Sequence, residues 1–67
     1  MAIHPDELHK IEDLIRAGEQ RISEQQDRVA RLEQEGSDAT AAREMLLILQ
    51  NSQVLLISRR NLLLRDN

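Results

Sequence analysis

Residues 45–64, MLLILQNSQVLLISRRNLLL, decide the fold of this chain. Their apolar residues form three blocks, at 45–49, 54–57 and 62–64, which recur about every two helical turns. On a helix, this spacing produces an apolar arc of roughly 220°, about twice the width that one partner helix covers. We therefore expect a helix that packs against the rest of the chain on one side and against another polypeptide on the remainder.

The composition favours long helices that associate. With 67 residues the chain is one domain at most, and a lone hairpin core barely offsets the conformational entropy that folding costs. The absence of Cys excludes disulfides, thiolate metal sites and Cys nucleophiles. Phe, Tyr and Trp are absent too, so the core must consist of aliphatic residues. Self-association is the remaining route to a larger core.

Upstream of this stretch, a heptad pattern predicts a helix over residues of about 5–35. Pro5 suits the first helical position, and Asp6 and Glu7 place negative charge in the first turn. Residues spaced alternately by three and four then define a coiled-coil seam. We interpret Gly18 as making room for a large side chain of the facing helix, and Gln25 as fixing the register. The seam consists of Leu8, Ile11, Ile15, Gly18, Ile22, Gln25, Val29 and Leu32.

The break between the two helical stretches is Gly36, Ser37 and Asp38. Gly36 can adopt the left-handed conformation that ends a helix, and Ser37 or Asp38 can cap a second helix over residues of about 39–65. A connection this short makes the helices antiparallel neighbours. The sequence thus predicts an all-α fold in which residues 1–67 form a single two-helix coiled-coil hairpin.

Folding the chain at this turn predicts a register in which Gly18 faces Leu56, Val29 faces Met45 and Ile15 faces Arg59. The second helix should then contribute Met45, Leu49, Leu56 and Leu63 to the seam. The flanks of that line should form an oligomer interface, which consists of Leu46, Ile48, Leu55, Ile57, Leu62 and Leu64. Two hairpins joined in this way form a four-helix bundle with twofold symmetry. A dimer is favoured, but a tetramer or a bundle with a different protein stays open, as does the flank that faces the symmetry mate.

Charge and motifs exclude several functions. The net charge of −3 argues against a general nucleic-acid surface, and only Arg59, Arg60 and Arg65 suggest one. Arg59 and Arg60 can instead pair with acidic residues of the first helix, and they make a membrane span improbable. Neither a basic-then-apolar leader nor a phosphate, nucleophile or metal motif is found, and His4 and His9 lack the spacing of helical metal ligands. We expect a cytoplasmic protein without enzymatic activity, cofactor or metal.

One part of the sequence resembles a known group. Arg28, Val29, Arg31 and Leu32, followed by Gly36 and Asp38, fit the pattern R-[IV]-x-R-L-x-x-x-G-x-D. The chain resembles small helical-hairpin proteins of alphaproteobacteria, common in rhizobia-like bacteria, over residues of about 19–64. The resemblance implies a bacterial origin and carries over no activity or site residue.

These features lead to three hypotheses. The first is a non-enzymatic, self-associating coiled-coil interaction or scaffold protein. The second is a small regulator or adaptor whose second helix binds a heterologous helical partner. The third is a nucleic-acid-binding hairpin, similar in architecture to the plasmid-encoded Rop dimer, which binds RNA. Residues 5–35, the predicted first helix, include nine acidic and five basic residues. This excess of negative charge argues against the third hypothesis.

Overall fold

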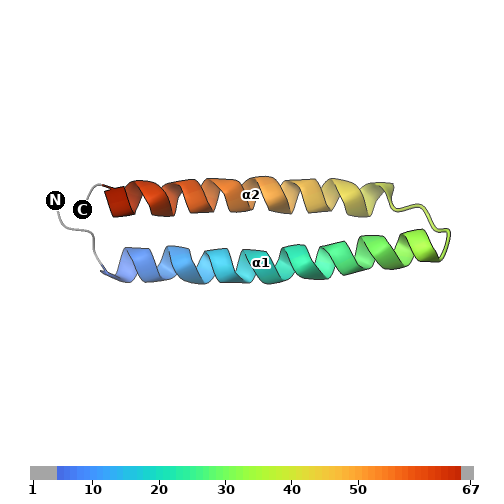
Figure 1. The fold of residues 1–67 in the computed structure, drawn as a ribbon, viewed down its shortest axis with the longest axis horizontal. Coiled ribbons are helices and arrows are strands. Elements are labelled where there is room, and N and C mark those ends of the chain that lie inside the picture. Colours follow the sequence, from blue (N-terminus) through green and yellow to red (C-terminus); the bar gives the residue numbers. More distant parts are fainter. Residues whose placement is uncertain (1–4, 66–67) are drawn as a thin grey trace.

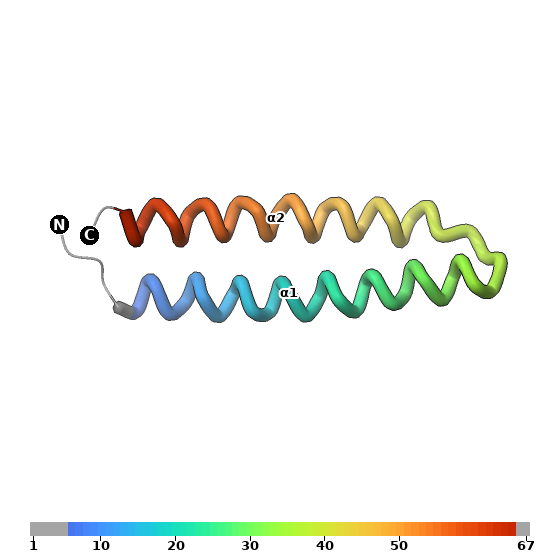
Figure 2. Tube along the Cα trace, in the orientation of Figure 1, coloured from blue at the N-terminus to red at the C-terminus, as the bar shows by residue number. Residues whose placement is uncertain are grey.

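The computed structural model describes residues 5–65 and contains two helices, α1 (Pro5–Gln34) and α2 (Thr40–Arg65). The helices run antiparallel along their whole length and are joined by a short connection (Figures 1 and 2). The molecule measures 53 × 14 × 12 Å, so it is a rod two helices wide. Within the described residues there is no strand, and the predicted all-helical hairpin is confirmed for them.

The connection ends α1 with a hydrogen-bonded turn at Gly36. The Ser37 N–H donates to the carbonyl of Leu32 at 2.8 Å, and the Gly36 N–H donates to the carbonyl of Glu33 at 3.1 Å. This pair of bonds is the Schellman motif, which requires a left-handed residue after the helix. Gly36 supplies it with a φ of 70°, as predicted. The helix ends at Gln34 and α2 begins at Thr40, each one residue inside the predicted bounds.

Asp38 organises the start of α2. Its Oδ1 accepts hydrogen bonds from the Thr40 hydroxyl at 2.6 Å and from the Thr40 backbone N–H at 2.9 Å. A carboxylate in this position satisfies a backbone donor that the first helical turn leaves unpaired. The bond from the Thr40 hydroxyl, and then that from the backbone, lowers the pKa of Asp38 below its ordinary value.

This lowered pKa predicts an acid-dependent part of the stability. A carboxyl group whose pKa is lower in the folded chain stabilises the fold above its unfolded pKa of about 3.9. That contribution is lost as the pH falls through the folded pKa of Asp38. Asp38→Asn keeps an acceptor oxygen but does not titrate, so wild type should be the more stable at neutral pH and lose this advantage in acid. Thermal melts of both proteins from pH 7 to about pH 2 test this, and a difference independent of pH would contradict it.

The packed face of α2 follows one unbroken heptad pattern. Every residue of this seam is buried or half-buried, and successive members lie alternately three and four residues apart. All eight predicted seam residues of α1 are likewise buried or half-buried. The seam consists of Ala39, which directly precedes α2, and of Ala42, Leu46, Leu49, Gln53, Leu56, Arg60 and Leu63 of α2.

The predicted register was wrong by about one helical turn of α2. Gly18 lies against Gln53, not against Leu56. Met45 was predicted to face Val29, but its side chain is 47% exposed and lies outside the seam. Leu46 was assigned to the oligomer interface, but it packs inside the hairpin.

The cause of this shift lies next to the turn. Val29 forms a buried cluster with Ala39 and Ala42, and Leu32 and Leu46 pack against it. The two small alanines let the helices approach closely, so the seam begins at Ala39 and reaches Leu46 at the second step. Met45, one residue earlier, therefore lies at the edge of the seam, where its side chain is about half exposed.

Candidate interaction surface

The centre of the hairpin holds a notch at Gly18 that is filled by Gln53. The Gln53 side chain is only 7% exposed, and its Nε2 donates to the backbone carbonyl of Ile15 at 2.7 Å. Its Oε1 occupies the space that a Cβ on residue 18 would need. The prediction that Gly18 makes room for a large side chain named the wrong residue, because it assumed Leu56.

A second glutamine bonds in the opposite direction. Gln25 of α1 donates from Nε2 to the backbone carbonyl of Ala42 at 3.0 Å. A helical carbonyl has a second lone pair, so it can accept this bond without losing its own helical partner. Throughout the described part of the chain, no buried side-chain nitrogen or oxygen lacks a partner. Gln53 is therefore internal to the hairpin, whereas Gln25 is half-buried and also lines the surface beside the seam.

The apolar residues that the seam does not use form two stripes on α2. Stripe A consists of Met45, Ile48, Leu55 and Leu62, and stripe B consists of Leu47, Val54, Ile57 and Leu64. A polar row runs between them and consists of Glu44, Asn51, Ser58 and Arg65. Within each set, successive residues lie three or seven positions apart in the sequence. Residues at these spacings lie on the same side of a helix, so each set follows one line along α2. Of the predicted interface residues, Ile57 is half-buried, and Ile48, Leu55, Leu62 and Leu64 are exposed.

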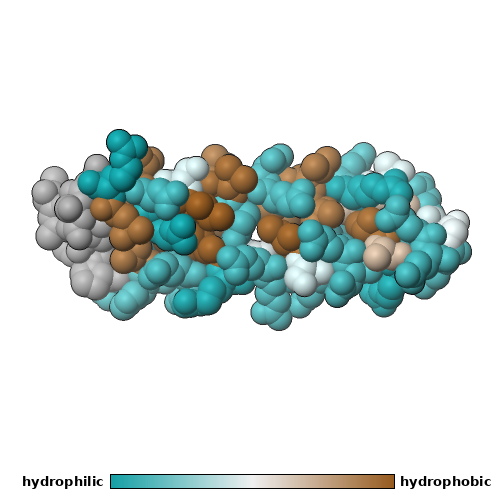
Figure 3. Space-filling view, viewed as in Figure 1, coloured by the Kyte–Doolittle hydropathy of each residue, from teal (hydrophilic) through white to brown (hydrophobic). Residues whose placement is uncertain are grey.

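Stripe A borders the side of the hairpin that is hollowed by grooves. One groove lies near the chain ends. It is lined by Glu7, Lys10, Ile11 and Leu14 of α1 and by Leu56, Arg59 and Leu63 of α2. A second groove lies nearer the turn, where Met45 and Leu49 meet Arg21 and Arg28. Leu14 is the one large apolar residue of the described α1 that is strongly exposed. Figure 3 shows that apolar residues reach the surface in separate patches along the hairpin.

The opposite side, next to stripe B, carries an ion pair between the helices. Arg43 donates from Nη2 to Glu33 at 3.0 Å, and both side chains are about half exposed. An exposed pair of this kind contributes little stability, typically below about 1 kcal/mol. Within residues 5–65, the other ion pair joins Arg16 to Asp13, so the expected pairing of Arg59 and Arg60 with acidic residues of α1 is not formed.

The three arginines near the end of α2 do not form one basic face. Arg59 lines the groove beside Leu14, whereas Arg60 is half-buried in the seam, with its guanidinium 3.3 Å from Asn61 Oδ1. Arg65 lies on the outer polar row. Successive positions at 100° per residue place these three side chains on different sides of α2. This arrangement does not match the continuous basic surface that a nucleic-acid backbone needs.

No chemistry-bearing cluster is found among residues 5–65. They contain no group of three or more His, Asp or Glu side chains placed to hold a metal ion. His9 is exposed at the start of α1, and His4 lies outside the described residues. Neither α1 nor α2 has the combination of length and hydropathy needed to cross a bilayer.

The geometry defines a class, the antiparallel helical hairpin with an unused apolar surface on one helix. Comparison of the chain with protein families, with curated proteins and with solved structures finds no match. The resemblance to alphaproteobacterial hairpin proteins and the bacterial origin it implies therefore stay predictions.

Proposed function

We propose that this chain is a non-enzymatic interaction or scaffold protein that acts through self-association of its hairpin. The observation that carries the proposal is stripe A. Its three heptad-spaced residues Ile48, Leu55 and Leu62 are 58%, 71% and 56% exposed, although all are large and aliphatic. A row of exposed large aliphatic residues on a small chain marks an interaction surface.

The thin core of the hairpin supports this proposal. Among the described residues, no large side chain is completely buried, and the core consists mostly of half-buried residues along one seam. Single hairpins of this size rarely bury enough apolar surface to be stable alone. A second hairpin would bury the stripe and thicken the core of both copies.

The favoured assembly is a homodimeric four-helix bundle. Outside its seam, α1 offers only Leu14 as a large exposed apolar residue, whereas α2 offers two stripes. The central contact between copies would therefore be α2 against α2, with the α1 helices on the outside. Each buried Leu or Ile side chain contributes about 1.5–3 kcal/mol, so a few residues from each copy are enough for a stable dimer.

Sedimentation analysis of the intact chain tests the proposal. We expect a species of twice the chain mass of 7.7 kDa at micromolar concentration, dissociating on dilution. The thermal midpoint should also rise with protein concentration, because association stabilises only the folded state. A folded monomer with a concentration-independent midpoint would contradict self-association.

Stripe B supports a second candidate function, that of an adaptor or regulator. Leu47 and Val54 are 59% and 61% exposed, and they lie on the other side of the polar row from stripe A. A dimer that covers stripe A would leave them accessible to a helix of a different protein. A partner retained by Leu55→Glu but lost by Val54→Glu would support this function. The cytoplasmic location and the absence of enzymatic activity stay predictions from the sequence.

A further inference from the structure

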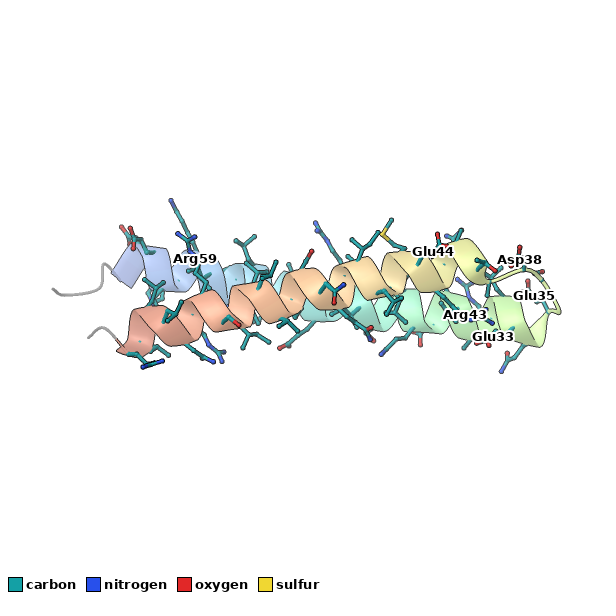
Figure 4. The ribbon with its side chains drawn as sticks, turned by 90° about the horizontal axis from the view of Figure 1, so that it is seen from above. Glu33, Glu35, Asp38, Arg43, Glu44 and Arg59 are labelled. Carbon is teal, nitrogen blue, oxygen red and sulfur yellow. The ribbon has the colours of Figure 1, made fainter. Side chains whose placement is uncertain are left out.

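The two ends of α2 differ in charge. Arg59, Arg60 and Arg65 lie in its last two turns, without an acidic residue of α2 between them. At the other end, Arg43 is paired with Glu33, and Glu44 is exposed on the polar row beside stripe A. Figure 4 shows Glu44 near the turn and Arg59 towards the opposite end of the hairpin. On α2 itself, the end near the chain termini is therefore positive and the end near the turn is not, while Glu7 and Lys10 of α1 share the groove that Arg59 lines.

Arg59 makes this asymmetry important for a second copy. It lies seven residues after Ser52 and fourteen after Met45, so it shares a line along α2 with this member of stripe A, and its side chain is exposed. If two α2 helices pair in parallel through stripe A, Arg59 of one copy faces Arg59 of the other. Two like charges at such a contact repel each other, and burying them is costly.

An antiparallel pair removes this conflict. We propose that a second copy docks on stripe A with its α2 antiparallel, around a twofold axis that passes between Ser52 and Leu55. This inference rests on the proposed self-association and adds the surface and the direction of pairing. Arg59 of each copy then lies beside Ile48 of the other, within about one helical turn of the other copy's Glu44.

The apolar residues also match in this arrangement. Met45 of one copy meets Leu62 of the other at both ends of the contact, and the two Leu55 side chains lie near the axis. The aliphatic part of Arg59 covers Ile48 while its guanidinium remains in water next to Glu44. The antiparallel arrangement thus combines apolar burial with opposite charges, and the dipoles of the two helices also oppose each other favourably.

Single cysteines can measure the direction of pairing, because the chain has no Cys of its own. In the antiparallel dimer, the two copies of residue 52 are offset by only about 5 Å along the axis, and those of residue 62 by about 25 Å. A thiol cross-linker with a reach of about 10 Å should therefore join Ser52→Cys to itself and should not join Leu62→Cys to itself. An equimolar mixture of Met45→Cys and Leu62→Cys should give the mixed cross-link.

Each result has a distinct meaning, provided that sedimentation and circular dichroism first show the variant to be dimeric and helical. Self-cross-linking of Leu62→Cys as efficient as that of Ser52→Cys would show a parallel pair and overturn the inference, while leaving self-association intact. Cross-linking of Val54→Cys without that of Ser52→Cys would assign the interface to stripe B and also overturn it. A wild-type chain that remains monomeric would refute the proposed function itself, and a ladder of larger species would show open-ended assembly in place of the dimer.

Discussion

Leu55→Glu should weaken self-association of the hairpin about 1000-fold, and Val54→Glu should leave it nearly unchanged. The Leu55 side chain is the most exposed of the large apolar residues, and it lies at the centre of the proposed contact in both copies. Losing the burial of about 2 kcal/mol per copy removes about 4 kcal/mol from the dimer. Placing a carboxylate near its symmetry-related copy adds repulsion in the same direction.

The Val54 variant is a matched control for the Leu55 variant. The two residues are neighbours in the middle of α2, have similar exposure, and receive the same substitution. The two substitutions therefore have nearly equal effects on helix propensity and on net charge. They differ in the stripe that receives the carboxylate, which is stripe A for Leu55→Glu and stripe B for Val54→Glu. Dissociation constants from sedimentation at several concentrations would compare them. Equal weakening by both substitutions, or stronger weakening by Val54→Glu, would show that stripe A is not the interface.

Gly18→Ala should lower the free energy of unfolding by about 1 kcal/mol, although alanine is the better helix former by a similar amount. The added methyl group would overlap the Gln53 amide, which then has to leave its site. Gln53 loses its bond to the Ile15 carbonyl, and a buried amide left without a partner costs about 1–3 kcal/mol. This loss exceeds the gain in helix propensity.

The effect of Gly18→Ala on the free energy of unfolding should change sign when Gln53 is replaced by a shorter residue. With Gln53→Ala as the background, nothing occupies the notch, and Gly18→Ala should stabilise the chain by about 1 kcal/mol. The double-mutant cycle should therefore give a coupling of about 2 kcal/mol between positions 18 and 53. Urea denaturation of the four proteins at one concentration measures it. A coupling near zero would show that Gln53 does not occupy the notch in solution.

The apolar pattern of the sequence was sufficient to predict α1 and the hairpin. Its seam from Leu8 to Leu32 is a narrow apolar line between polar residues, so only one face of the helix can be turned inward. The turn was equally well marked, since Gly36 is the only residue there that adopts a positive φ without strain. The sequence likewise showed that α2 has more apolar surface than one neighbour can cover.

Hydrophobicity placed Leu49, Leu56 and Leu63 in the seam, where the structure has them, but it did not determine the register of α2. With leucine or isoleucine on nearly every side, the largest residues suggested a seam through Met45 and a contact between Gly18 and Leu56. The seam in the structure instead includes Ala42, Gln53 and Arg60, and it leaves Leu55 in solvent. The alternating spacing of three and four residues from Ala39 to Leu63 was a signal of this seam. A search for large apolar residues misses it, because several of its positions hold small or polar residues.

The sequence by itself thus determined two antiparallel helices, a tight turn and an excess of apolar surface on the second helix. The register became known from the packed structure, and with it that Leu46 lies in the seam and Met45 outside it. The physical reason is that apolar burial is nearly the same for several rotations of α2, so it does not discriminate between them. Close packing does, because Val29 fits against the small Ala39 and Ala42, and the Gln53 amide fits only where Gly18 has no side chain.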